Sequence, residues 1–142
     1  MIDSSFISPY ALGVELVRVQ ESLQAAELCL REGLVNSAAS RAYYAMFQAA
    51  QLALETAGYR RTEWSHKGLH SSFSHELIHR RKRFPRIFRG YLTSALAVRQ
   101  AADYGEAGVS AKIAQRQVRR AATFVQILEE VIRHGTRLPG ER

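Results

Sequence analysis

The chain has 142 residues, of which 46% are hydrophobic and only 3 are proline. This length and composition are typical of a folded protein with one hydrophobic core, so we expect a single domain over residues 1–142. No apolar run approaches the roughly 20 residues that cross a bilayer, and residues 1–5 lack the basic start of a secretory signal. We therefore expect a cytoplasmic protein with no membrane partner.

Apolar residues recur at helical spacing from the start of the chain. The first predicted helix covers residues 9–32, because Pro9 suits a first helical turn and Gly33 can adopt the left-handed conformation that ends a helix. The second begins at residue 36 or 37 and ends before Gly58. Its apolar side chains fall on two faces, which predicts a central helix with neighbours on both sides.

Three further helices follow in the second half of the chain. The third is predicted over residues 64–81 and the fourth from Pro85, with Arg99 as the one charged member of its apolar stripe. After a glycine-containing connection, Ser110 can cap a fifth helix that stops at Gly135.

The same pattern defines the fold class. No segment alternates as a half-buried strand does, and the connections are short. The sequence therefore predicts an all-α protein, an antiparallel up-and-down bundle of four to five helices, with its core over about residues 8–134. Residues 136–142 are expected to form a mobile tail.

The positive charge is concentrated in one region. The net charge is +7, and residues 60–99 hold ten basic side chains against two acidic ones. Such an excess favours contact with phosphate, and the planar fork of arginine can bind two phosphate oxygens at once. A solvated basic face that only keeps the protein soluble is the alternative. The residues that we predict to bind nucleic acid are Arg80, Arg81, Lys82, Arg83, Arg86 and Arg89.

Four histidines, His66, His70, His75 and His79, lie close together in the sequence. On a continuous α-helix the first pair would point about 180° away from the second pair, so the four would not converge on one ion. We therefore predict no metal site and no cofactor. His66 is the histidine we single out, because it begins a helix beside a capping serine.

Three stretches of the sequence resemble the HEPN domain family: residues 40–47 (SRAYYAMF), 65–68 (SHKG) and 99–104 (RQAADY). The resemblance implies a bundle of four or five helices that is frequently a homodimer. It also implies an RNA- or nucleotide-related function, since the active members are metal-independent endoribonucleases. These members are commonly toxins paired with a minimal nucleotidyltransferase.

The active members carry an arginine followed after a few residues by a histidine. By this resemblance Arg99 would stabilise a phosphate, and the histidine would assist attack by the 2′-hydroxyl. Here Asp103 follows Arg99 by one turn, and Tyr104, Gly105 and Glu106 stand where the histidine could fall. Tyrosine titrates far above neutral pH and is no evident replacement. The candidate catalytic residues are Arg99, Asp103, Tyr104 and His66, with His70 as a second possible source of a histidine.

Three hypotheses remain open at this stage. The favoured one is an RNA- or nucleotide-binding subunit of a toxin–antitoxin or nucleotidyltransferase-associated system. The second is a metal-independent ribonuclease that uses Arg99 with a histidine from elsewhere, and the third is a structural or antitoxin-like subunit. For Arg99 and Asp103, a purely structural ion pair is an interpretation of equal weight to a functional site. For Tyr43, Tyr44 and Phe47 the favoured interpretation is packing in the hydrophobic core.

Overall fold

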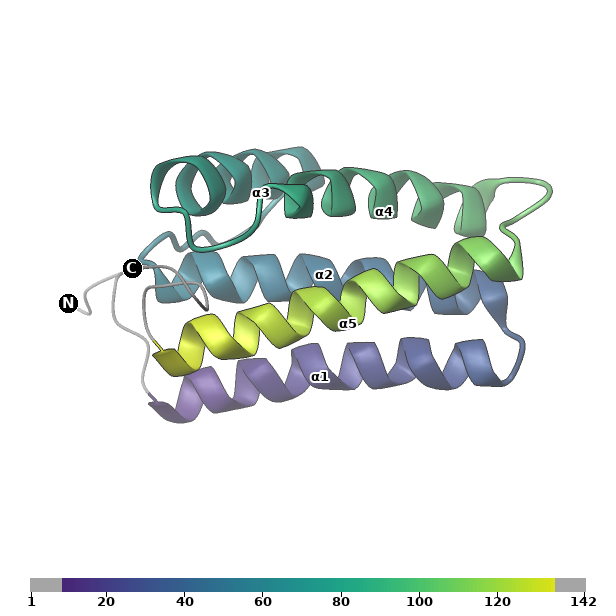
Figure 1. Cartoon of the computed structure of the whole chain (residues 1–142), viewed down its shortest axis with the longest axis horizontal. Coiled ribbons are helices and arrows are strands. Elements are labelled where there is room, and N and C mark those ends of the chain that lie inside the picture. Colours follow the sequence, from purple (N-terminus) through teal and green to yellow (C-terminus); the bar gives the residue numbers. More distant parts are fainter. Residues whose placement is uncertain (1–8, 135–142) are drawn as a thin grey trace.

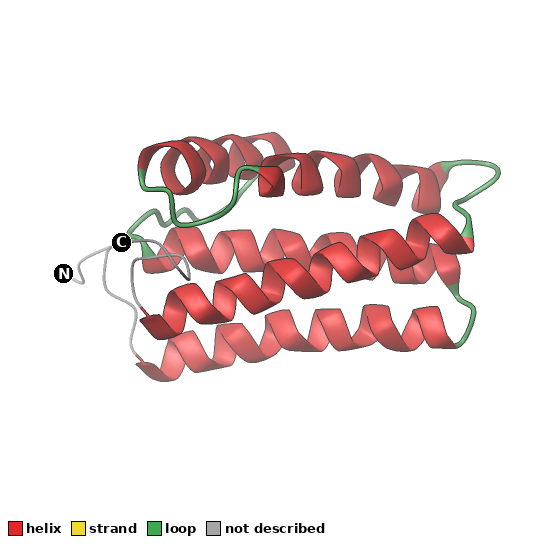
Figure 2. Cartoon of the chain, viewed as in Figure 1, coloured by secondary structure: helices red, strands yellow, loops and turns green. Residues whose placement is uncertain are grey.

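The computed structural model describes residues 9–134, with side chains from Glu15 onward. These residues form five α-helices and one π-helical segment and contain no strand (Figure 2). The prediction of an all-α bundle is confirmed. The predicted mobile tail, residues 136–142, lies outside the described residues. The single domain stays a prediction. The elements are α1 (Pro9–Arg31), α2 (Val35–Thr56), α3 (His66–Ser72), η1 (Phe73–Arg80), α4 (Ile87–Tyr104) and α5 (Ala111–His134).

Four long helices, α1, α2, α4 and α5, run in alternating directions along the bundle (Figure 1). The shorter α3–η1 segment lies beside the first half of α4, at the end of the bundle where α2 ends. Helix α2 contacts every other element, as its two apolar faces predicted. None of the helices in the described part of the chain is long and apolar enough to cross a membrane.

Small side chains bring the neighbours of α2 close to it. Ala38, Ala42, Ala45 and Ala49 are completely buried on this helix. Alanine leaves little between the backbones of two helices, so ridges of the neighbouring helices can approach closely. The opposite side of α2 buries larger side chains, including Tyr43, and this side faces α3.

An aromatic cluster joins η1 to α4 and α5. The rings of Phe73, Phe84, Phe88 and Phe124 are all buried and pack on one another, with 4.4 Å between the centroids of Phe88 and Phe124. Stacked aromatic rings contribute beyond the area that they bury. This cluster holds η1 and the start of α4 in a fixed relation.

The ends of several helices follow from local sequence signals. Gly33 has a φ of +77° at the end of α1. Ser65 Oγ accepts a hydrogen bond from the Gly68 amide at 2.9 Å, and Ser110 Oγ accepts one from the Ile113 amide at 3.2 Å. The predicted helix boundaries are close to those observed, although α4 begins at Ile87 rather than at Pro85.

The third predicted helix is wrong in two respects. It begins at His66 rather than at residue 64, and it continues from Phe73 to Arg80 as a π-helix rather than an α-helix. At its end the Arg81 amide donates to the Glu76 carbonyl, five residues back, at 3.0 Å. A π turn takes about one residue more than an α turn, so side chains in η1 point in other directions than α-helical spacing predicts.

The connection between α4 and α5 is held against the start of α2. Asn36 Oδ1 accepts a hydrogen bond from the Val109 amide at 2.9 Å. Gly108 has a φ of +66°, and a Cβ at this position would lie 2.5 Å from Asn36 Oδ1. Glycine is therefore required for this close approach, which places the end of α4 beside the first turns of α2.

Candidate functional site

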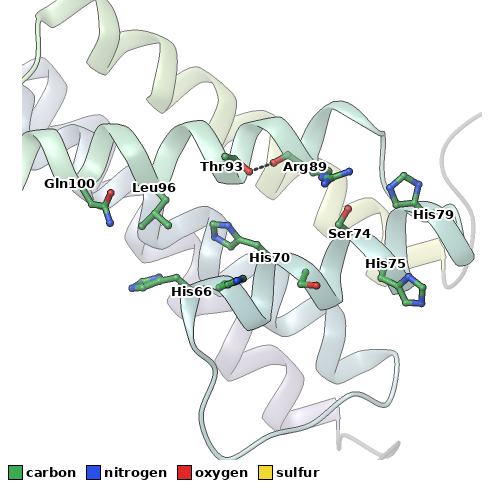
Figure 3. Close-up of a pocket in the computed structure, with 11 residues that line it drawn as sticks. His66, His70, Ser74, His75, His79, Arg89, Thr93, Leu96 and Gln100 are labelled. Atoms are coloured by element: carbon green, nitrogen blue, oxygen red, sulfur yellow. Dashed lines mark hydrogen bonds between the residues drawn. The ribbon is translucent and has the colours of Figure 1, made fainter.

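A groove of about 610 Å³ lies between the α3–η1 segment and α4. None of the described residues that line it is acidic, whereas Lys67 and Arg89 contribute positive charge. Figure 3 shows that α3 and η1 form one wall and α4 the other. The lining side chains are those of His66, Lys67, His70, Ser71, Ser74, His75, His79, Arg89, Thr93, Leu96 and Gln100.

All four histidines of this segment line the same groove. The prediction that the second pair would point about 180° from the first is therefore wrong for His79, because the wide turns of η1 rotate this side chain back toward the groove. His75 lies at the rim and points away from α4 (Figure 3). Within residues 15–134, no three metal-ligating side chains come together as a site that could hold a metal ion.

A buried tyrosine connects the first two histidines. The Tyr43 hydroxyl forms hydrogen bonds with His66 Nδ1 at 2.6 Å and with His70 Nε2 at 3.0 Å. The Tyr43 ring is fully buried, as its core reading predicted, but its hydroxyl reaches the wall of the groove. Tyr43 therefore fixes the orientation of both imidazole rings.

The chemistry of this network depends on where its protons lie. A phenol donates one hydrogen bond, so one histidine accepts from Tyr43 and the other donates an N–H to it. Burial, together with the nearby His66, lowers the pKa of His70 below its ordinary value. Burial raises the pKa of Tyr43 far above its ordinary value, although the charge of Arg99 opposes the shift. Tyr43 is therefore a neutral phenol at physiological pH.

A second network surrounds Arg99 on the neighbouring part of α4. Arg99 Nη2 donates a hydrogen bond to the Tyr44 hydroxyl at 2.9 Å, and Arg99 Nε lies 3.0 Å from Asp103 Oδ2. The same carboxylate oxygen accepts a hydrogen bond from Ser40 Oγ at 3.2 Å. The predicted ion pair between Arg99 and Asp103 is therefore present and is tied to α2.

The Arg99 side chain is held on several sides. It is only 16% exposed, against 29% for Asp103, and its guanidinium lies 5.3 Å from the ring centroid of Tyr44 and 5.6 Å from that of Tyr104. Although Nε is close to the carboxylate, it has no hydrogen-bond partner of good geometry. Tyr104 itself is 75% exposed. The charge of Arg99 is thus largely balanced within the protein.

The two networks meet at consecutive residues of α2. The rings of Tyr43 and Tyr44 lie 5.9 Å apart, one bonded to the histidines and the other to Arg99. The structure therefore brings Arg99, Asp103 and Tyr104 together, and connects them to His66 through the tyrosine pair.

Of the six residues predicted to bind nucleic acid, the first two, Arg80 and Arg81, make contacts within the protein. The Tyr59 hydroxyl donates to Glu76 Oε1 and accepts from Arg80 and Arg81 at 3.0 and 3.1 Å. Arg80 also forms an ion pair with Glu76 at 2.9 Å. These two arginines thus brace the end of η1 against Tyr59.

The other four predicted residues differ from one another in burial and in position. Arg83 is half-buried and lines a separate small cavity, and burial together with Arg81 lowers the pKa of its guanidinium. Lys82, with a φ of 53°, and Arg86 are exposed. Of the six, only Arg89 lines the groove.

Two features of the site were missed from the sequence. Tyr43 was read only as a core residue, and the wall formed by α4 was not recognised. The sequence does hold a signal for that wall, because four lining residues of α4 are spaced by four, three and four positions and so share one face of the helix. These residues are Arg89, Thr93, Leu96 and Gln100.

Comparison with known proteins identifies the class to which this bundle belongs. Residues 16–131 match the HEPN domain family. The chain is also 34% identical over 117 residues to a UPF0332 protein of Gloeobacter violaceus, an alignment that covers 81% of this chain and 90% of that relative. The chain belongs to the HEPN domain family, and the resemblance expected from its three stretches is confirmed. Membership supports a function related to RNA or nucleotides.

Proposed function

We propose that the protein is an RNA- or nucleotide-binding HEPN subunit of a toxin–antitoxin or nucleotidyltransferase-associated system in the cytoplasm. The observation that carries this proposal is the groove, which has positive charge on both walls and no acidic residue among its described lining. Its volume of about 610 Å³ falls within the roughly 300–1,000 Å³ of small-ligand sites.

The groove offers donors suited to phosphate and sugar oxygens. Lys67 on α3 and Arg89 on α4 supply charge from opposite walls, while Ser71, Ser74 and Thr93 supply hydroxyl groups. An imidazole such as His70, held by Tyr43, presents a flat ring for contact with a base. The arrangement suits a nucleotide unit placed across the two walls.

The surroundings of Arg99 favour binding over cleavage. Its charge is balanced by Asp103, and no histidine occupies residues 104–106. A guanidinium that is already paired gives less stabilisation to a phosphate in the transition state, and a histidine general acid and base is missing beside it.

The proposal is tested by measuring the affinity for labelled single-stranded RNA and for a labelled nucleotide over a range of salt concentrations. In the Lys67→Gln/Arg89→Gln double variant we expect the RNA affinity to fall about tenfold at low salt. The slope of log affinity against log salt concentration should fall by about 1.4, since each lost contact with a single strand contributes about 0.7.

The matched control is Arg18→Gln/Arg31→Gln, which removes the same charge from α1. Helix α1 contacts neither α3 nor α4, so this variant should bind like the wild type. Absence of RNA and nucleotide binding by the wild type at low salt would overturn the proposal and favour a structural or antitoxin-like subunit.

The proposal includes a nucleotidyltransferase protein partner and a homodimer, both of which follow from the family resemblance. Exposed apolar side chains support contact with other chains, among them Tyr104 beside Arg99 and Leu28 on α1. Light scattering of the purified protein tests the dimer: a mass of one chain at micromolar concentration would contradict it.

Metal-independent RNA cleavage is a second candidate function. It is favoured by the 2.6 Å hydrogen bond between Tyr43 and His66 Nδ1, because a histidine oriented by another side chain is typical of a general base. His66 Nε2 makes no hydrogen bond to a described residue and is available to a 2′-hydroxyl.

Incubation of a mixed RNA pool with the protein and a chelator tests this candidate. A ribonuclease of this kind should lose cleavage in Arg99→Ala and in His66→Ala/His70→Ala, whereas His75→Ala at the rim should retain it. If even a high concentration of wild-type protein leaves the RNA intact, the candidate is excluded.

A further inference from the structure

A second basic hollow lies on another part of the surface. It has a volume of about 410 Å³ and is lined by Tyr91 of α4 and by Arg116, Arg119, Arg120 and Thr123 of α5. The α5 residues are spaced by three, one and three positions, which places them on one face of the helix. No acidic side chain is among the lining residues.

Two arginines of this hollow differ from Arg80 and Arg99 in having no carboxylate partner among the described residues. Arg80 and Arg99 form ion pairs with Glu76 and Asp103. Among residues 15–134, no carboxylate forms an ion pair with Arg116 or Arg119, and the structure shows no hydrogen bond from either guanidinium to a described residue. Like charges one helical turn apart repel one another, and an anion bound between them relieves that repulsion.

The third arginine is fixed by an aromatic ring. The guanidinium of Arg120 lies 4.9 Å from the centroid of the Tyr91 ring, and this ring stacks on that of Phe88 in the core. The stacking orders Arg120 and Tyr91 together at the base of the hollow. An ordered plane next to two exposed guanidinium groups combines a surface for base stacking with phosphate donors.

The hollow is separate from the groove between α3 and α4. Tyr91 follows Arg89 by two residues, a rotation of about 200° on an α-helix, so the two residues lie on opposite sides of α4. The sequence showed the positive excess only over residues 60–99. The hollow was missed because acidic residues elsewhere in the chain cancel the charge of α5.

We propose that the hollow of Tyr91, Arg116, Arg119 and Arg120 binds the phosphate backbone of a single-stranded RNA segment. The inference shares its ligand class with the proposed function but rests on a different surface of the protein. The exposed Arg116 and Arg119 contact phosphate oxygens, and the ordered pair of Arg120 and Tyr91 contacts a base or sugar.

The test uses the full chain and a labelled single-stranded RNA. Because Arg116 and Arg119 are exposed, the Arg116→Gln/Arg119→Gln variant should keep the thermal stability of the wild type. We expect its RNA affinity to fall about tenfold at low salt, with a salt slope reduced by about 1.4. The control Arg18→Gln/Arg133→Gln, on α1 and at the far end of α5, should bind like the wild type.

Comparison with the groove variant distinguishes the two proposals. If only Arg116→Gln/Arg119→Gln weakens RNA binding, the hollow is supported and the groove fails; if only Lys67→Gln/Arg89→Gln does so, the hollow is excluded. A variant that loses binding to anionic phospholipid vesicles but keeps RNA binding would assign the hollow to a membrane surface and overturn the inference.

A measurement on the wild type avoids any effect of substitution. Phenylglyoxal modifies accessible arginines, and mass spectrometry locates the modified sites. RNA should protect Arg116 and Arg119, while Arg133 should react equally with and without RNA. Equal modification of Arg116 and Arg119 in both samples would contradict the proposal.

Discussion

Tyr43 and Tyr44 are neighbours in the sequence but belong to different parts of the molecule. Tyr43 is fully buried and holds two histidines that line an open groove, whereas Tyr44 is half-buried and receives a hydrogen bond from Arg99. Successive residues of a helix are rotated by about 100°, so one faces α3 and the other α4. A single sequence stretch therefore supports two networks.

The two networks differ in their charge balance. The Arg99 network contains a cation, a carboxylate and two hydroxyl groups that bond one another. The groove contains cations and histidines with no acid among its described lining. A balanced cluster stabilises the fold, while an unbalanced one can bind an anion. This difference, rather than the number of basic residues in the sequence, guides the assignment of sites in this bundle.

The two networks can be compared by their contribution to stability, and the largest loss of stability is expected from removal of the Tyr43 hydroxyl. Tyr43→Phe loses hydrogen bonds to two histidines in a buried setting, and we expect the free energy of unfolding to fall by about 1–3 kcal/mol. Tyr44→Phe loses one half-buried hydrogen bond and should cost about 0.5–1.5 kcal/mol. Urea denaturation measures both. Equal losses of unfolding free energy in the two variants would contradict the expected difference between the two networks.

A somewhat smaller effect is expected from the charge pair of the second network. Arg99→Met leaves Asp103 without its partner and should lower the free energy of unfolding by about 1 kcal/mol, since the carboxylate keeps some access to water. A double-mutant cycle with Asp103→Asn isolates the pair, with an expected coupling of about 0.5–1 kcal/mol. A coupling of zero would show that the ion pair contributes nothing to stability.

The smallest effect is expected in the pH dependence of stability. The pKa of His70 is lower in the folded protein than its ordinary value of 6.5, so the unfolded chain binds more protons below that pH. Stability should therefore fall as the pH drops below about 6.5, and His70 should contribute no slope above it. His70→Phe should flatten this part of the profile in thermal unfolding.

The local features of the chain could be predicted because they depend on neighbours in the sequence. The end of α1 at Gly33 and the caps at Ser65 and Ser110 require only the residues of one or two turns. The central position of α2 followed from its two apolar faces. The ion pair of Arg99 with Asp103 was likewise visible, since the two residues are one turn apart on one helix.

The site itself depended on distant contacts. The π-helix from Phe73 to Arg80 was not visible in the apolar pattern, and it turns His79 toward the groove. The contacts of Arg80 and Arg81 with the Tyr59 hydroxyl were likewise not visible, because Tyr59 lies 21 and 22 residues away in the sequence.

The sequence by itself therefore determined the four long helices, the ends of several of them, the all-α class and, through three short stretches, the HEPN family. Helix periodicity and capping are local, so the residues of each segment suffice to specify them. Only the tertiary structure decided which polar groups are paired and which remain available to a ligand. That choice depends on packing α2 against α3 and α4, which brings Tyr43 to His66 and Ser40 to Asp103 across long separations in the chain.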